Sequence, residues 1–117
     1  MGKAVERKNG RKKVSCPVET TIGAIGGRWK VLVIHHLMEG TQRFGELSRL
    51  LKGVSARTLT RQLRELEECG VIHRKVYEQI PPKVEYSLTA LGVELEGVLL
   101  AMHAWGEKLE RALRRRG

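Results

Sequence analysis

The chain has 117 residues, of which 41% are hydrophobic and 30% are charged, and 22 Lys and Arg residues against 13 acidic ones give a net charge of +9. This length predicts one globular domain that needs no disulfide or metal to hold its core. No apolar run approaches the roughly 20 residues of a membrane span, no signal peptide is recognisable, and two cysteines are too few for a disulfide scaffold. We therefore expect a cytoplasmic protein with no membrane partner.

The positive charge is concentrated at the two ends of the chain. Residues 1–15 contain six Lys or Arg residues against one Glu, and residues 111–117 contain four Arg residues and no acid. In between, residues 43–83 are net basic and residues 84–110 net acidic, a segregation typical of proteins with a separate nucleic-acid-binding face. We expect a flexible basic arm over residues 1–15, a folded domain over residues 16–110 and a basic C-terminal end.

Four helices are predicted before residue 71. Apolar residues at helical spacing, with glycine or proline at the boundaries, place the first three at 18–25, 28–38 and 44–51. A fourth helix begins after Ser55, a favourable N-cap residue, and stops at Gly70.

A hairpin and a long helix follow. Residues 71–77 and 83–88 are rich in β-branched and aromatic residues, and the loop between them contains Pro81-Pro82, which predicts a two-stranded β-wing. Thr89 then caps a helix over residues 90–115, about 39 Å long at a rise of about 1.5 Å per residue.

The apolar stripe of this last helix is longer than so small a domain can cover, which predicts a homodimer. Folding of the stripe back onto its own core is the alternative. The residues expected at the dimer interface are Leu95, Val98, Leu99, Met102, Trp105 and Leu109.

The fourth helix carries the strongest functional signal. Leucines at helical spacing form one face, and Arg57, Arg61 and Arg64 fall on the other. A helix that presents arginines beside its N-terminus can lie in the DNA major groove, so Arg57, Thr58 and Arg61 are predicted to contact base edges. Solvated pairs such as Arg61–Glu65 and Arg64–Glu68 are the alternative. The residues predicted to contact the DNA backbone are Arg43, Ser55, Thr60, Arg64, Arg74, Lys75 and Lys83.

The order of these elements and several short motifs resemble the HxlR-type regulators, a branch close to the MarR regulators. The resemblance covers about residues 16–107 and implies a mainly α (α+β) winged helix-turn-helix with a long C-terminal dimerisation helix, acting as a dimeric DNA-binding transcriptional regulator. The long basic arm and the Arg114-Arg115-Arg116 end depart from the usual pattern. The matching stretches are Cys16-Pro17, Ile25-Gly26-Gly27-Arg28-Trp29, Arg43-Phe44-Gly45-Glu46-Leu47, Leu63-Arg64-Glu65-Leu66-Glu67, Gly70-Val71-Ile72 and Pro81-Pro82-Lys83-Val84-Glu85-Tyr86-Ser87-Leu88-Thr89.

The resemblance also implies a regulatory role for Cys16, because a cysteine just before the first helix acts as a thiol switch in some members. Nearby lysines and the following helix N-terminus favour a thiolate here, although a small buried residue is the alternative. Cys69 is expected in the core. The four histidines do not have metal-ligand spacing, and there is no nucleophile–base pair or phosphate-binding glycine loop, so we expect no metal, no cofactor and no enzyme activity.

These features predict a homodimer that reads a pseudo-palindromic operator in double-stranded DNA, with half-sites about 10 bp apart or a multiple of that spacing. Repression is the commoner outcome of operator occlusion, and a small molecule or electrophile is the expected class of effector. Two alternatives stay open. The first alternative to an operator-reading regulator is an architectural protein that coats DNA through its basic tails. The second is a winged-helix module that binds other proteins.

Overall fold

The computed structural model describes residues 16–117, so the predicted basic arm lies outside the described residues. Within the described part, no helix is long and apolar enough to cross a membrane. The first four predicted helices and both strands of the hairpin are confirmed to within two residues. In chain order the elements are α1 (Pro17–Ile25), α2 (Trp29–Leu37), β1 (Gln42–Arg43), α3 (Phe44–Leu50), α4 (Ala56–Glu68), β2 (Ile72–Tyr77), β3 (Lys83–Leu88), α5 (Ala90–Val93) and α6 (Glu96–Arg116).

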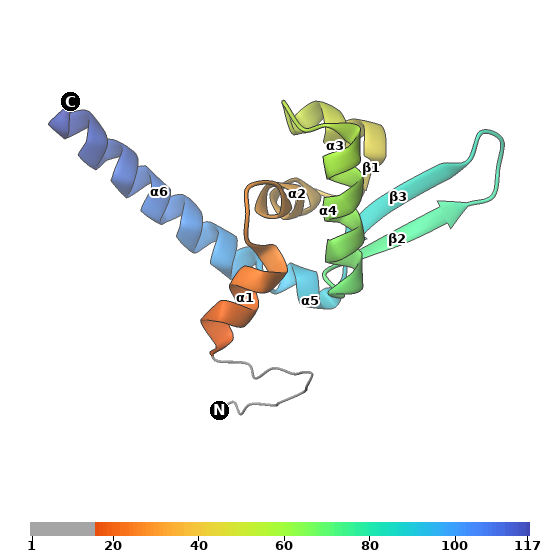
Figure 1. The fold of residues 1–117 in the computed structure, drawn as a ribbon, viewed down its shortest axis with the longest axis horizontal. Helices are drawn as coiled ribbons and strands as arrows, with labels where there is room; N and C mark the ends of the chain where they lie inside the picture. Colours follow the sequence, from red (N-terminus) through yellow and green to blue (C-terminus); the bar gives the residue numbers. More distant parts are fainter. Residues whose placement is uncertain (1–15) are drawn as a thin grey trace.

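The core lies where α2, α3 and α4 meet the base of the hairpin (Figure 1). Aliphatic side chains three or four residues apart supply the buried side of each helix, and Tyr86 closes the core from the sheet. Cores of this kind are close-packed, so each helix is held in one orientation by its neighbours. The side chains with the least exposure are Val33, Ile34, Leu47, Leu59, Leu63, Leu66 and Ile72.

The predicted hairpin belongs to a three-stranded antiparallel sheet in the order β1-β3-β2. In β1, Gln42 lies opposite Tyr86 and Arg43 opposite Glu85. A strand of two residues has no alternating pattern to reveal it, which explains why the sequence predicted only the two-stranded wing. The added strand joins the start of α3 to the base of the wing.

The single helix predicted over residues 90–115 is wrong, because the structure divides this segment into α5 and α6. At Glu94 and Leu95 the backbone N–H groups donate to carbonyls three residues back, on Leu91 and Gly92, instead of four. This tight turn separates α5 from the 21 residues of α6.

The turn has a structural cause, since α5 is tied to the segment that follows α4. The Thr89 hydroxyl donates to the carbonyl oxygens of Gly70 (2.6 Å) and Val71 (3.1 Å), and it accepts the N–H of Gly92 at 3.0 Å. A Cβ atom on Gly92 would overlap the Val71 carbonyl oxygen, so only glycine permits this close approach. The result is that α5 is fixed to the body while α6 projects away from it (Figure 1).

Candidate DNA-binding surface

Helix α4 presents its arginines to solvent because its other side is fixed in the core. The Ser55 hydroxyl caps the helix by accepting the backbone N–H of Thr58 at 3.0 Å, so the predicted N-cap is confirmed. Thr58 is half-buried beside this cap, whereas Ala56, in the first turn of α4, is exposed. The exposed basic and hydroxyl side chains of α4 are Arg57, Thr60, Arg61 and Arg64.

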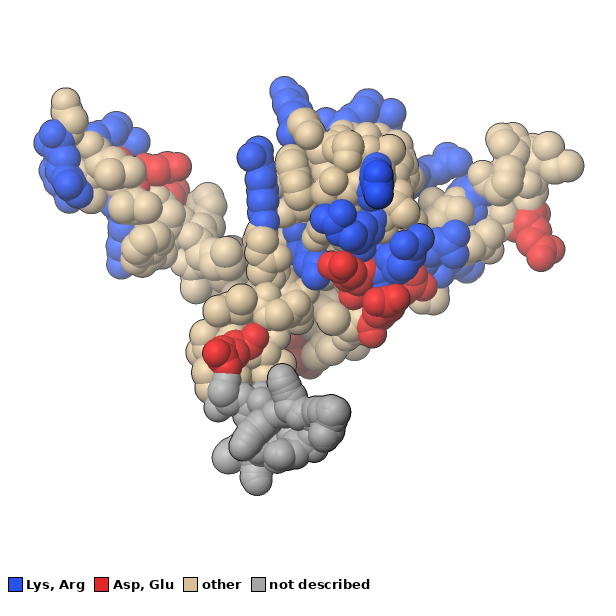
Figure 2. All heavy atoms as spheres, in the orientation of Figure 1, with Lys and Arg blue, Asp and Glu red and all other residues tan. Residues whose placement is uncertain are grey.

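Positive charge gathers over α4 and continues onto the hairpin. Figure 2 shows this basic area, with acidic side chains grouped beside it toward the C-terminal end of α4. The C-terminal end of α4 carries the exposed Glu67 and Glu68, which follow the arginines in sequence. A polyanion that approached α4 would therefore be attracted to its N-terminal half and repelled from its C-terminal end.

Within the part of the chain that the structure describes, the arginines of α4 are not engaged by carboxylates. Across residues 16–117, no ion pair involves Arg57, Arg61 or Arg64, so the intrahelical pairs considered from the sequence are not formed. Glu65 instead pairs with Lys30 of α2, with 2.8 Å between Nζ and Oε1. The hydrogen bond from Lys30 is the main cause of a lowered pKa for the Glu65 carboxyl.

A hollow of about 330 Å³ lies between α4 and the hairpin. Arg64 and Thr60 of α4 line one wall, and Arg74 of β2 lines the other, with Tyr86 among the remaining lining residues. The structure thus brings together three of the residues predicted to contact the DNA backbone. Two guanidinium groups and a hydroxyl facing one hollow can bind phosphate oxygens. Glu67 also lines the hollow and limits its positive charge.

The other predicted wing residues point to the opposite face of the sheet. Lys75 lies across from Glu85 and Tyr77 across from Lys83, so these four side chains share one face, whereas Arg74 lies across from Tyr86 on the other. The predicted wing contacts are therefore divided between two surfaces.

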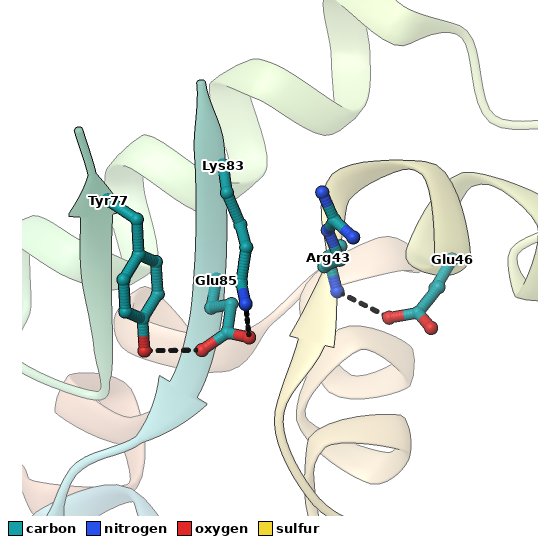
Figure 3. A network of polar contacts seen from close by, with 5 residues as sticks. All are labelled: Arg43, Glu46, Tyr77, Lys83 and Glu85. Carbon is teal, nitrogen blue, oxygen red and sulfur yellow. Dashed lines mark hydrogen bonds and ion pairs between the residues drawn. The ribbon is translucent and has the colours of Figure 1, made fainter. Parts of the chain in front are cut away.

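Lys83 is engaged on its face of the wing (Figure 3). Its Nζ lies 3.5 Å from Glu85 Oε2 and 4.6 Å from the centre of the Tyr77 ring, and the Tyr77 hydroxyl donates to Glu85 Oε1 at 2.9 Å. Lys75 also lies over Tyr77, with Nζ 4.9 Å from the ring centre. These contacts stiffen the hairpin, and Lys83 must give them up wholly or in part to reach a phosphate.

Arg43 lies at the junction of β1 and α3. Its backbone N–H donates to Glu46 Oε1 at 2.7 Å, which closes the start of α3 (Figure 3). The exposed Arg43 shares a sheet face with Glu85, its cross-strand partner. Arg43 therefore belongs with the Lys75 face of the sheet and not with the hollow beside α4.

This arrangement of helices, arginines and wing has close counterparts among known proteins. Residues 24–113 match the HxlR-like helix-turn-helix family. The chain belongs to that family. Among its relatives is the HTH-type transcriptional regulator YdeP of Bacillus subtilis (strain 168), 58% identical over 93 residues that cover 80% of this chain and 73% of YdeP. YdeP and the further B. subtilis relatives YybR and YtcD are HTH-type transcriptional regulators.

Solved structures of redox regulators and of MarR-family transcriptional regulators share the fold. The redox regulator HypR in its reduced form is 48% identical with a TM-score of 0.81, over 86% of this chain and 99% of that one. Its oxidised form gives 52% identity and a TM-score of 0.75, over 80% and 96% of the two chains. The reduced form of YodB from B. subtilis is 36% identical with a TM-score of 0.71, over 81% and 94%. The winged helix-turn-helix prediction is confirmed.

Both cysteines of this HxlR-like chain are free thiols at the surface. Cys16 occupies the N-cap position of α1. The expectation that Cys69 lies in the core is wrong, because it follows the last buried turn of α4 and its side chain is exposed. Cys69 lines a mainly apolar hollow of about 550 Å³ between α1, the end of α4 and α5. In the described residues, no three His, Cys or Glu side chains lie close enough together to hold a metal ion.

The predicted dimer residues divide into two groups. Leu95 and Leu99 are half-buried against the core of their own chain. A separate set of side chains forms the exposed apolar stripe of α6. It consists of Val98, Met102, Trp105, Leu109 and Leu113.

Proposed function

We propose that this protein is a sequence-specific transcriptional regulator that reads DNA with α4. The observation that carries the proposal is the set of exposed arginines that form no ion pair with any of residues 16–117, on a helix whose other face is fixed in the core. Arg57 and Arg61, with Thr58 beside them, are the candidates for base contact, because a guanidinium can donate two hydrogen bonds to one guanine edge. Sequence is then read by a rigid element, as specificity requires.

The remaining basic residues would hold the DNA backbone on two surfaces. Arg64, Arg74 and Thr60 line the hollow beside α4 and are the nearest candidates for phosphate contact. Ser55 lies at the N-terminus of α4, where the helix dipole favours an anion. Arg43, Lys75 and Lys83 occupy the other sheet face and suit the phosphates that flank the wing.

We propose that the active form is a homodimer joined by the apolar stripe of α6. Exposed Val18 and Ile22 of α1 lie four residues apart and add to the apolar surface available to a second copy. A two-fold dimer presents two α4 helices to DNA and so favours a pseudo-palindromic operator, with half-sites about one helical turn, or a multiple of it, apart. Occupation of such an operator at a promoter would repress transcription.

Operator preference tests this function directly. We expect the protein to bind DNA from upstream of its own gene about a thousandfold more tightly than random DNA of equal length, in about 150 mM salt. Arg57→Ala and Arg61→Ala should each cost about tenfold on the preferred DNA, and should relax the preference at one base pair.

Equal binding to both DNAs by the intact protein would contradict sequence reading at that site. Deleting residues 1–15 and 112–117 then decides the alternative. A protein that coats DNA through its tails would lose nearly all affinity, whereas an operator reader would keep its preference.

We further propose that Cys16 couples the regulator to oxidants or electrophiles. Its support is the exposed thiol at the N-cap of α1, close to the apolar surface offered to a second copy, and similarity to the redox regulator HypR. Iodoacetamide at neutral pH should label Cys16 in the folded protein, and Cys16→Ser should abolish the effect of such reagents on DNA binding. Labelling only after denaturation would contradict the proposal, and Cys69→Ser is the matched control.

A further inference from the structure

Lys30 connects α2 to the DNA-facing helix. Its side chain is only 12% exposed, and its Nζ reaches across to Glu65 Oε1 at 2.8 Å. A lysine so nearly buried requires an acidic or polar partner. Glu65 is half-exposed at 42%, so its carboxylate is free to turn toward a different cation if Lys30 does not hold it.

Arg61 is the other cation within reach of Glu65. The two residues are four positions apart on α4, a spacing at which side chains on a helix lie next to each other and oppositely charged ones attract. The positive charge of Arg61 contributes to the lowered pKa of Glu65, although less than Lys30 does. Arg61 is therefore close enough to interact with the carboxylate, yet across residues 16–117 it forms no ion pair.

We propose that Lys30 is a positioning residue for DNA recognition, which holds Glu65 against α2 and thereby leaves the Arg61 guanidinium free to contact DNA. The inference rests on the proposed function, in which Arg61 lies at the DNA interface. Without Lys30, Glu65 pairs with Arg61, and DNA must break that pair before Arg61 can bind.

Substitution of Lys30 tests this role, because methionine keeps the length and apolar stem of lysine while removing its charge. With a duplex of about three helical turns, selected from random sequences by the wild-type protein, Lys30→Met should weaken binding by about threefold. Adding Glu65→Gln to Lys30→Met should restore wild-type affinity, because the glutamine amide does not compete for Arg61. In an Arg61→Ala background, Lys30→Met should have no further effect.

A purely structural role for Lys30 predicts a different pattern. Lys30→Met would then weaken DNA binding in every background, and Glu65→Gln would not restore it. That result overturns the inference. Wild-type DNA affinity in folded Lys30→Met also overturns it. Thermal unfolding of each variant shows whether it is folded. If Lys30→Met does not fold, Lys30→Ala replaces it in the same series, since it also removes the partner of Glu65 and adds no new polar group.

Failure of the proposed function gives a separate result. Wild-type protein would then bind the selected and the random duplex equally. The same variants compared on the random duplex still decide the role of Lys30, because pairing with Glu65 would withdraw Arg61 from phosphates as well as from bases.

Discussion

Helices α4 and α6 differ in how much of their apolar surface is covered by contacts within one chain. In α4 three leucines are almost fully buried, and the arginines on the other side are exposed and form no ion pair with the described residues. In the longer α6 no residue is buried, and its exposed side includes a tryptophan and several aliphatic residues. The apolar side of α4 is covered within one chain, whereas α6 leaves an exposed apolar surface of the kind that marks an interaction site.

The difference shows that the two helices present surfaces suited to different partners. Exposed arginines in water are stable and suit a polyanion, so α4 is ready to bind without rearrangement. Exposed aromatic and aliphatic side chains gain free energy when they are covered by another apolar surface. Substitutions in α4 should therefore weaken DNA binding, and substitutions in α6 should weaken dimer formation, while the other helix stays intact.

The largest expected effect is the loss of the dimer. Trp105→Glu places a charge in the apolar stripe of α6 and, across a two-fold axis, next to its own copy. We expect a monomer in sedimentation equilibrium and a loss of operator affinity of about a hundredfold, on the scale of an interface hot spot.

Leu100→Glu is the matched control for this substitution. Leu100 and Trp105 are equally exposed, at 63%, but Leu100 lies beside His35 of α2 and Met38, which follows α2, and outside the stripe. We expect the Leu100→Glu protein to remain dimeric. If Trp105→Glu and Leu100→Glu both gave monomers, or both gave dimers, the assignment of the stripe as the dimer interface would be contradicted.

A smaller effect separates the two faces of the wing. Arg74 lines the hollow beside α4, whereas Lys83 is already engaged by Glu85 and Tyr77. Arg74→Ala should weaken binding to all DNA sequences by about fivefold and reduce the salt dependence by about one counterion. Lys83→Ala should have less effect in the same titrations. A larger loss for Lys83→Ala would mean that DNA contacts mainly the Tyr77 face.

The smallest expected effect is on stability, at His36 of α2. Burial lowers the pKa of His36, and the neighbouring His35 lowers it further, while Glu39 opposes both. The unfolded chain therefore binds this proton more readily, and the free energy of unfolding should fall slightly as the pH drops below about 6.5. His36→Gln should flatten this dependence in thermal unfolding between about pH 7.5 and pH 5.5. His73→Gln on the exposed wing is the control and should leave it unchanged.

The sequence predicts best those features that repeat locally. Leucine spacing located α4, and the Pro81-Pro82 loop between β-rich runs located the wing. Features that depend on distant contacts were missed. The division between α5 and α6 comes from the bonding of Thr89 to the end of α4, and the Lys30–Glu65 pair joins residues far apart in sequence. Sequence spacing suggested Arg61 as the partner of Glu65, and only the packing of α2 on α4 brings Lys30 into competition.

The turn at Glu94 and Leu95 has a consequence for how such a regulator changes during evolution. Because α5 is fixed beside the end of α4, this turn sets the direction of α6 relative to α4. In the proposed dimer that direction determines how far apart the two copies of α4 stand. One inserted residue would rotate α6 by about 100° and shift it by about 1.5 Å. An insertion at this turn would thus change the operator spacing that the dimer fits, while the base preference, which depends on α4, stays the same.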